Sequence, residues 1–337
     1  MFEGNTVGVV VPAFNEEDFV GEVIDTMPDF VDRVYVVDDG STDATWEVVQ
    51  RHARRANRRS VAPEAVTDGG AVFDRRVVPI RHEENRGVGN AIKTGYLQAR
   101  EDDLDVTAVM GGDGQMDPEE LTDIIQPVVD GVADYAKGNR LLYREYREGM
   151  SRWRFFGNAV LTFLTKIASG YWKMMDPQNG YTAISSYALE NVGIERMYGY
   201  YGYCNDLLVR LNAKGMRIAD VGVPAVYGDE ESSIRYRTYI RRVSWMLLRD
   251  FLWRLKVKYL VLDFHPLALF YLFGAAMSLL GVLGGGWSLY DKLANGDPLF
   301  LQASLSLVIF LIGSMFLLFA MLFDMQVNED KELQIHE

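Results

Sequence analysis

Acidic and small residues follow three apolar runs in the N-terminal half of the chain. The run at 7–11 leads into PAFNEE (12–17), the run at 33–37 into DDGSTD (38–43), and the run at 106–110 into GGDGQMD (111–117). Short continuous apolar runs indicate strands buried on both faces, and the carboxyl ends of parallel strands meet at one edge of a sheet. Carboxylates gathered there repel one another unless a positive charge joins them. A divalent cation carrying a diphosphate would supply that charge.

Four of the five aspartates in these segments have different expected roles. Asp43 stands near the start of one predicted helix and Asp117 just before another, where a carboxylate caps free backbone N–H groups. Asp39 and Asp113 have no such structural explanation, so we expect these two to be functional.

The order of apolar patterns predicts an α/β fold with a mostly parallel sheet. Strands are expected at 7–11, 33–37, 77–80, 106–110 and 133–137, and helices at 17–27, 42–52, 87–100 and 118–129. The arginine-rich stretch between residues 52 and 76 is interpreted as a surface loop that is solvated or contacts anionic lipid. The chain has neither a GxGxxG after its first strand nor a GxxxxGK[ST], which argues against dinucleotide and P-loop nucleotide sites.

Two long uncharged stretches, 266–290 and 298–323, each exceed the ~20 residues that a membrane helix requires. The short polar link at 291–297 predicts a transmembrane hairpin over 263–324. A basic amphipathic segment at 231–262 precedes it, and positive charge flanks the cytoplasmic side of a span. We therefore expect a protein of the cell membrane with two spans, whose N-terminal domain, 325–337 tail and both termini are cytoplasmic. The apolar run at 7–11 is too short for a signal peptide.

Composition limits the partners. Among the 337 residues, 47 acidic side chains outnumber 34 basic ones, giving a net charge of −13, which argues against nucleic-acid binding. The single Cys204 excludes an internal disulfide framework and a Cys-rich zinc site. Only nine basic residues are Lys, and an acidic chain with few Lys is typical of proteins from a high-salt cytoplasm. We expect a halophilic archaeal source.

The three segments carry a family resemblance. VVVPAFNEE (9–17), VVDDGSTDAT (36–45) and VMGGDGQMDPEE (109–120) resemble, in this order, the motifs of family-2 glycosyltransferases with the GT-A fold. Within that family they are similar to the dolichyl- and polyprenyl-phosphate hexose synthases. The resemblance covers about 7–231 and implies a cytoplasmic GT-A domain at 1–230, with a Rossmann-like, mostly parallel sheet, ahead of the hairpin.

The resemblance implies a set of residues that bind the nucleotide sugar. Pro12, Phe14 and Glu16 correspond to family positions that hold the nucleoside, and Val37 and Asp39 to positions that contact base and ribose.

The metal motif of the family departs from its usual form here. The segment reads Gly111-Gly112-Asp113, so Gly111 stands where the family has its first Asp. The resemblance leaves Gly112 and Asp113 for the donor, and Asp113 and Gln115 as ligands of Mg²⁺ or Mn²⁺, with water completing the shell. The departure also leaves open a weak or absent metal dependence.

Two basic segments correspond to phosphate-binding parts of the family. KGNRLL (137–142) matches a segment whose arginine meets phosphate, here Arg140. The aromatic-rich stretch at 151–172 predicts an amphipathic helix in the membrane interface, with a helix packed on the sheet as the alternative. The resemblance assigns the acceptor phosphate to Arg152 or Arg154.

DPQNGYTAIS (176–185) resembles the acceptor-side segment of the family, where Gly180 allows close approach of the backbone. Asp206 corresponds to a catalytic base in many relatives, or it is a helix N-terminal carboxylate that satisfies the dipole. Where relatives often carry a phosphate-binding arginine this chain has Tyr227, and Arg235 is a substitute nearby.

The expected activity is inverting transfer of a hexose from a UDP- or GDP-linked sugar to dolichyl or polyprenyl phosphate, feeding N-linked glycosylation of surface (S-layer) proteins. The first alternative is a hexosyltransferase that extends a lipid-linked sugar. The second is a membrane scaffold that binds nucleotide sugar without catalysis. The expected partners are nucleotide sugar, polyprenyl phosphate and membrane lipid, and homo-oligomer formation is left open.

Overall fold

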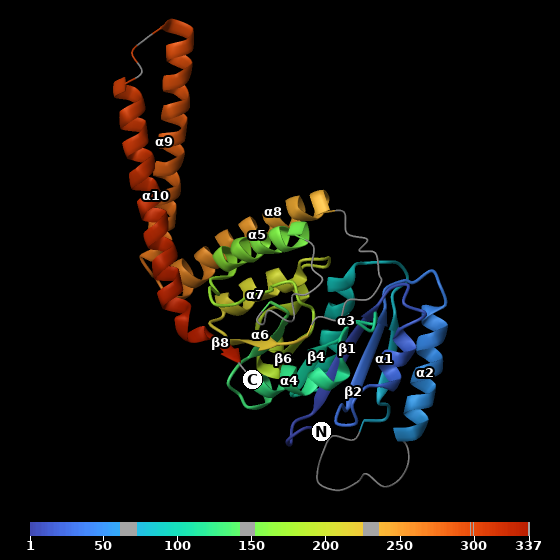
Figure 1. Cartoon of the computed structure of the whole chain (residues 1–337). Coiled ribbons are helices and arrows are strands. Elements are labelled where there is room, and N and C mark those ends of the chain that lie inside the picture. The colour runs from blue at the N-terminus through green and yellow to red at the C-terminus, as the bar shows by residue number, and fades with distance from the viewer. Residues whose placement is uncertain (61–72, 142–151, 225–235, 297, 299, 336–337) are drawn as a thin grey trace. The chain divides into compact units, whose positions relative to one another are not determined.

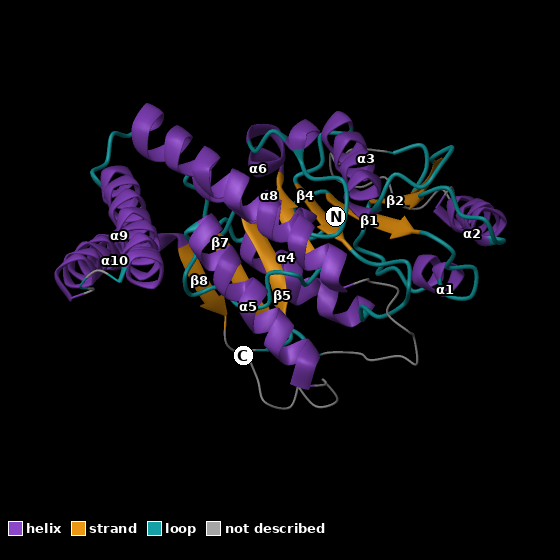
Figure 2. Ribbon diagram, turned by 90° about the horizontal axis from the view of Figure 1, so that it is seen from above, coloured by secondary structure: helices purple, strands orange, loops and turns teal. Residues whose placement is uncertain are grey.

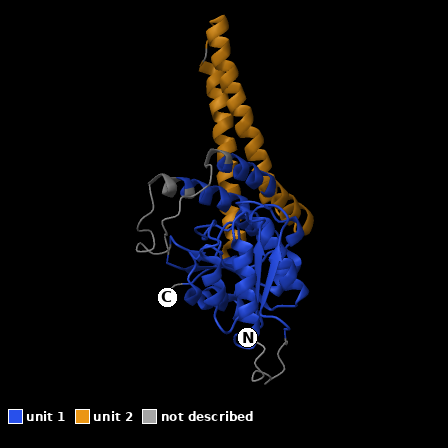
Figure 3. Ribbon diagram, turned by 90° about the vertical axis from the view of Figure 1, so that its right-hand side faces the viewer, with its two compact units in different colours: residues 1–250, 330–337 blue, residues 251–329 orange. Residues whose placement is uncertain are grey.

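The computed structural model describes residues 1–60, 73–141, 152–224, 236–296, 298 and 300–335. The chain forms two compact units, coloured separately in Figure 3. The first consists of residues 1–250 together with 330–337, and the second of residues 251–329. The last residues of the chain therefore belong to the N-terminal unit.

The first unit is built on a mixed, mostly parallel sheet of eight strands. The strands are β1 (Val7–Ala13), β2 (Arg33–Asp38), β3 (Val77–Arg81), β4 (Val106–Val109), β5 (Tyr135–Asn139), β6 (Thr182–Ser185), β7 (Ile218–Gly222) and β8 (Glu332–Ile335). Their order is β3-β2-β1-β4-β6-β5-β7-β8, and only β6 runs antiparallel to its neighbours. The predicted mostly parallel α/β sheet is confirmed.

Helices cover both faces of this sheet (Figures 1 and 2). The helices of the first unit are α1 (Val20–Asp25), α2 (Thr45–Ser60), α3 (Val88–Glu101), α4 (Leu121–Val129), α5 (Arg152–Ser169), α6 (Ser186–Asn191), α7 (Tyr203–Ala213) and the part of α8 (Tyr236–Lys256) up to Asp250, with 3-10 turns at Pro118–Glu120 and Ile194–Arg196. Alternate residues of β1 enter opposite cores. Val9 packs with α1, α2 and α4, and Val10 packs with α3, α6 and α7. This two-sided burial explains the continuous apolar run.

Two sequence predictions within this unit were wrong in detail. Helix α2 continues to Ser60, because Val48, Val49 and Ala53 give it a buried face. The arginines between 51 and 59 therefore lie on a helix instead of in a loop, whereas 61–72 are outside the described residues. The strand predicted at 133–137 is shifted to Tyr135–Asn139, where its ladder with β7 begins.

The C-terminal tail contains a strand that the sequence analysis missed. Residues 325–337 were expected to be a separate tail, yet β8 pairs in parallel with β7, from Ile218 opposite Glu332 to Val221 opposite Ile335. Figure 2 shows β8 beside β7 at one end of the sheet. The short E-L-Q-I alternation lies after a long apolar helix and resembles a helix end more than a strand, which is why the pattern gave no signal.

The second unit is dominated by α9 (Leu267–Asn295) and α10 (Phe300–Asn328), each longer than its predicted span. By length and composition both could cross a membrane, with mean hydropathies of 2.0 and 2.7 over an 18-residue window of each. The two helices pack closely through small residues. A Cβ added at Gly281 would lie 2.6 Å from the Phe310 nitrogen, and one at Gly313 would lie 2.4 Å from the Ser278 nitrogen. Close contact through glycine is typical of helix pairs in lipid.

Within the second unit, a buried polar cluster joins the segment before α9 to the last turns of α10. The chain enters through a π-helical turn, Val257–Leu262, before α9. Arg254 and Asp324 are both 0% exposed and form an ion pair of 2.7 Å. The Tyr259 hydroxyl donates to Asp324, and the Asn328 amide donates to both Tyr259 and Asp324. Removing one partner of such a pair typically lowers the free energy of unfolding by about 3–5 kcal/mol. The cluster therefore holds the segment before α9 against the end of α10.

Candidate active site

The loops that follow β1, β2 and β4 are tied together at one edge of the sheet. The Asp39 nitrogen donates to the Ala13 carbonyl (2.9 Å), and the Gly112 nitrogen donates to the Pro12 carbonyl (3.1 Å). A Cβ at Gly112 would lie 2.9 Å from that same carbonyl oxygen, so only glycine fits this approach. The three acidic segments therefore meet where the strand order predicts.

The first segment is held by the second through hydroxyl and amide side chains. The Asn15 nitrogen donates to the Ser41 hydroxyl (2.9 Å), and the Glu16 nitrogen donates to the Thr45 hydroxyl (2.8 Å). Asn15 has φ of 57°, a left-handed conformation that Asn tolerates better than most residues. Phe14 is 40% exposed beside this edge, and its contact with a nucleoside stays a prediction.

Asp39 performs a structural task that the sequence did not indicate. Its side chain is almost fully buried and contacts the His82 ring (2.6 Å). It also accepts hydrogen bonds from the backbone nitrogens of Arg86 (3.0 Å) and Gly87 (2.7 Å). Asp39 thus organises the 82–87 loop at the site edge. The RHEENRG sequence directly after β3 is the signal that could have identified His82.

The Val37 side chain is 0% exposed and belongs to the core packed on α3. Its side chain therefore packs inside the protein, beneath the loop that follows β2. Contact with a ligand, as the resemblance suggested, would fall to neighbouring groups such as Pro12, which lies opposite Val37 in the ladder and is partly exposed.

Asp113 lies at this edge with a partly exposed carboxylate. Its Oδ1 accepts the backbone N–H of Gln115 (3.1 Å). Burial and then the charges of Glu16 and Asp113 raise the pKa of the Tyr201 phenol. The sequence analysis missed Tyr201, although the run YGYYGY (198–203) marks an aromatic loop next to Asp206.

The donor set fits a metal that arrives with its diphosphate better than a metal held by protein alone. Within the described residues, no group of three or more His, Cys, Asp or Glu side chains is placed to hold an ion. Asp113 and Gln115 offer two oxygen-bearing side chains on one turn, and both are partly exposed. Mg²⁺ commonly binds through one or two carboxylates plus phosphate oxygens and water. The two residues fit that mode.

The acceptor-like segment 176–185 lies against the loop that carries Asp113. The Tyr181 hydroxyl donates to the Asp117 carbonyl (2.8 Å). A Cβ at Gly180 would lie 3.2 Å from the Tyr203 hydroxyl and 3.5 Å from the Met116 methyl group. Glycine at this position therefore lets the segment approach both the Asp113 loop and the start of α7.

Arg140 is oriented by Asp176 through a two-pronged ion pair. The Arg140 Nε lies 2.8 Å from Asp176 Oδ2, and its Nη2 lies 3.0 Å from Oδ1. Burial alone would raise the pKa of Asp176, but the hydrogen bonds and charge of Arg140 outweigh it and hold this pKa below its ordinary value. The pair joins the end of β5 to the acceptor-like segment.

Asp206 is buried in the first turn of α7, with 1% of the residue exposed. Its Oδ2 accepts the Tyr198 backbone N–H (2.7 Å) and pairs with Arg210 Nε one turn later (2.9 Å). These contacts agree with the alternative of a structural carboxylate at a helix N-terminus.

The proposed acceptor arginines begin α5. Arg152 and Arg154 lie in its first turn, but their side chains are outside the described residues, as are Tyr227 and Arg235. Further along, α5 packs on α7 through a hydrogen bond from Asn205 to Thr165 (2.7 Å). Val160 and Phe163 remain exposed. The helix thus combines a packed side with exposed apolar residues, and its contact with membrane stays a prediction.

Residues 8–193 match the family described as Glycosyl transferase family 2. The chain belongs to glycosyl transferase family 2. It is accordingly a glycosyltransferase, and the expected GT-A fold agrees with a solved relative. Glucosyl-3-phosphoglycerate synthase from Mycobacterium tuberculosis, in complex with phosphoglyceric acid, superposes with a TM-score of 0.50 at 20% identity, covering 74% of this chain and 80% of that one.

Two curated relatives of this glycosyltransferase are archaeal. The UDP-N-acetylglucosamine–dolichyl-phosphate N-acetylglucosaminyltransferase of Methanococcus voltae is 27% identical over 65% of this chain and 85% of its own length. The dolichol-phosphate mannosyltransferase of Pyrococcus furiosus is 25% identical over 70% of this chain and 62% of its own length. This family-2 enzyme is therefore related to archaeal dolichyl-phosphate sugar transferases. The high-salt origin suggested by composition stays a prediction.

Proposed function

We propose that the enzyme transfers a hexose from a UDP- or GDP-linked sugar to dolichyl or polyprenyl phosphate. The names of its archaeal relatives support a lipid-phosphate acceptor. Within the first unit, the Tyr181–Asp117 hydrogen bond supports the proposal as well, because it brings the acceptor-like segment against the loop that carries Asp113.

The contacts of Asp206 are the observation that carries the choice of acceptor. A sugar hydroxyl is a weak nucleophile and needs a general base. Asp206, the candidate base, is buried and engaged by Arg210 and the Tyr198 N–H. A phosphate monoester, whose second pKa is near ~6 by analogy with phosphoamino acids, is largely ionised at neutral pH and needs no base. These contacts favour the phosphate acceptor over a lipid-linked sugar.

The remaining residues would position the reactants and balance charge. Pro12, Phe14, Glu16 and Asp39 would form the nucleoside end of the donor site, with Gly112 giving access to the diphosphate. Asp113 and Gln115 would hold Mg²⁺ or Mn²⁺, which supplies positive charge to the leaving diphosphate. Arg140, oriented by Asp176, would contact phosphate. Arg152 or Arg154 would bind the acceptor phosphate.

Direct attack of the acceptor phosphate oxygen on the anomeric carbon breaks the bond to the nucleoside diphosphate and inverts the configuration. An α-linked donor would give a β-linked lipid product. The leaving nucleoside diphosphate takes the bonding electron pair, so no external oxidant or reductant enters the balance.

We further propose that α9 and α10 cross the membrane. The residues before this helix pair and the residues after it both belong to the first unit. The chain must therefore cross the membrane an even number of times. The basic residues of α8, such as Arg241 and Arg249, favour a cytoplasmic location for the first unit. The lipid product would then form at the cytoplasmic face and feed surface-protein glycosylation.

A donor panel tests the proposal. Membranes containing the full chain are incubated with radiolabelled nucleotide sugars, one at a time, together with dolichyl phosphate, and the lipid fraction is analysed. The expected result is one labelled lipid, from which mild acid hydrolysis releases the labelled hexose. Label that appears only when a lipid-linked sugar is supplied would favour the alternative acceptor. Absence of label with every nucleotide sugar would contradict the proposal.

A further inference from the structure

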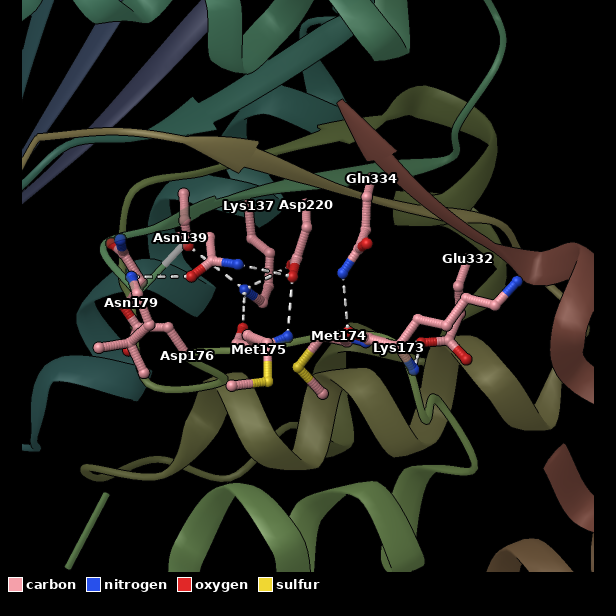
Figure 4. Close-up of polar contacts among 12 residues, drawn as sticks. Lys137, Asn139, Lys173, Met174, Met175, Asp176, Asn179, Asp220, Glu332 and Gln334 are labelled. Carbon is pink, nitrogen blue, oxygen red and sulfur yellow. Dashed lines mark hydrogen bonds and ion pairs between the residues drawn. The ribbon is translucent and has the colours of Figure 1, made fainter. Parts of the chain in front are cut away.

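The backbone of residues 172–176, which follows α5, is hydrogen-bonded by polar side chains on three neighbouring strands. Lys137 on β5, Asp220 on β7 and Gln334 on β8 lie opposite one another in the two ladders. Figure 4 shows this row facing residues 173–176, with Glu332 beside it on β8. Lys137 and Asp220 are buried, whereas Gln334 is exposed, and charged side chains are rare at buried sheet positions unless they are paired.

Glu332 accepts hydrogen bonds from three consecutive backbone nitrogens. Its carboxylate oxygens lie 2.6 Å from the Trp172 nitrogen, 2.7 Å from that of Lys173 and 2.8 Å from that of Met174. Only 7% of Glu332 is exposed. A buried N–H that loses its acceptor costs about 1–3 kcal/mol, so these three bonds set the path of the backbone.

The next residues continue the same arrangement toward the site. The Met175 nitrogen donates to Asp220 (2.7 Å), and its carbonyl accepts from the Lys137 ammonium. The Lys137–Asp220 pair, 2.7 Å apart, is itself buried. Every backbone N–H from Trp172 to Met175 therefore donates a hydrogen bond to a carboxylate on β7 or β8.

Asp176 then adopts φ of 45°, a left-handed conformation that is unfavourable for a residue other than glycine. Strained residues persist where their surroundings fix them, and they cluster at functional sites. Here the Asp176 carboxylate orients Arg140, and the segment goes on to Gly180 and Tyr181 beside the Asp113 loop.

We propose that β8 is a positioning element of the transferase site: Glu332 fixes the backbone at 172–174 and thereby holds the Asp176–Gly180 segment in place for the acceptor. The acceptor role of that segment rests on the function proposed above. Because β8 follows α10 after a short turn at Glu329–Lys331, the same hairpin that we place in the membrane delivers this residue to the catalytic unit.

The electrostatics of Glu332 agree with this assignment. Burial raises the pKa of Glu332 to about 7, although the three N–H bonds oppose the shift, and the charge of Asp220 adds to it. Lys166 on α5 also faces this carboxylate, and Lys137 and Asp220 lie on the neighbouring strands. Protonation near neutral pH would turn one acceptor oxygen into a donor that faces the backbone N–H groups.

The test compares Glu332→Gln with Asp330→Asn in the full chain. Gln keeps the shape of Glu but offers one acceptor oxygen, and its NH₂ group would face backbone N–H groups. Asp330 is an exposed carboxylate on the preceding turn, with Lys331 as its ion-pair partner, so its change to Asn is the matched control. Steady-state transfer from nucleotide sugar to dolichyl phosphate gives KM for each substrate and kcat.

For Glu332→Gln we expect KM for dolichyl phosphate to rise by about fivefold or more, with KM for the nucleotide sugar within about twofold, and Asp330→Asn to resemble wild type. An unchanged acceptor KM, or an equal rise in both KM values, would overturn the proposal. If Glu332→Gln does not fold, Glu332→Asp takes its place, since its side chain is one methylene shorter and cannot keep all three short hydrogen bonds. The same rise in the acceptor KM alone is expected, and unchanged KM values would overturn the proposal.

Amide hydrogen exchange separates this inference from the proposed function. In Glu332→Gln the amides of 172–174 should exchange at least about tenfold faster than in wild type, while those of β1 are unchanged. This measurement needs no substrate, so it remains decisive if dolichyl phosphate proves not to be the acceptor. Unchanged exchange at 172–174 would refute the role of Glu332.

Discussion

Replacing Asp206 by Asn separates the structural role of this carboxylate from the role of a general base. In the structure the Asp206 carboxylate is buried and binds Arg210 and the Tyr198 N–H. Asn keeps one acceptor oxygen but removes the charge, so the Arg210 guanidinium, whose side chain is 13% exposed, loses its ion pair with residue 206. Breaking a buried pair costs about 3–5 kcal/mol.

The loss should lie near the lower end of that range, because Arg210 keeps its hydrogen bond to the Arg196 carbonyl (2.7 Å). We expect the free energy of unfolding to fall by about 3 kcal/mol, which lowers Tm by about 6–12 °C for a unit of this size. Glu195→Gln is the control, since it breaks an exposed ion pair with Arg100 and should cost under about 1 kcal/mol.

Transfer by Asp206→Asn is measured as single-turnover formation of labelled lipid at saturating donor, at a temperature where both proteins are folded. A phosphate acceptor brings its own negative charge, so the rate should fall by less than about tenfold. A drop beyond about a hundredfold in a folded variant that still binds donor would identify Asp206 as a base. That result, or an unchanged Tm, would refute the reasoning from its contacts.

Two further predictions concern the two long C-terminal helices and the metal. A tag inserted at residue 294, in the last turn of α9, should be labelled from outside intact cells, and tags at either terminus only after lysis; a tag at 294 that is protected in intact cells would exclude the two-span arrangement. Gly111→Asp should lower the metal concentration needed for half-maximal rate, because it adds a carboxylate beside that of Asp113, whose Oδ1 would lie 2.7 Å from the new Cβ; an unchanged requirement would argue against the alignment of this motif.

Much of the donor side could be predicted from sequence because it depends on local patterns. Buried strands such as Val7–Ala13 give continuous apolar runs, and polar segments after their ends must meet at one edge. The tie between Gly112 and Pro12 follows from that geometry. The two long C-terminal helices were equally visible, since their uncharged length exceeds what a soluble core usually contains, and their crossing of a membrane stays a prediction.

The parts that sequence did not reveal depend on contacts between distant residues. Glu332 is more than 150 positions from the Trp172 nitrogen that it binds, and no local period marks β8 as a strand. The assignment of Asp39 to the ligand and of Asp206 to catalysis came from family position, whereas their partners His82 and Arg210 are set by tertiary packing. A sequence pattern can place a carboxylate at the edge of the sheet, but the tertiary partners of that carboxylate decide whether it is available to bind a ligand or accept a proton.

The central claim is that Asp113 serves the transfer of a hexose from nucleotide sugar to polyprenyl phosphate. The most direct measurement is the rate of labelled dolichyl-phosphate hexose formation by Asp113→Asn, with Asp117→Asn as the control from the same loop, where the carboxylate accepts the Glu119 N–H (2.9 Å). Loss of a charged ligand at the leaving diphosphate should cost about 3–4 kcal/mol, a rate loss of about 10²–10³, with folding intact. Asp117→Asn should stay within about tenfold of wild type, because it loses only a helix cap. Activity of folded Asp113→Asn within about threefold of wild type would contradict the account.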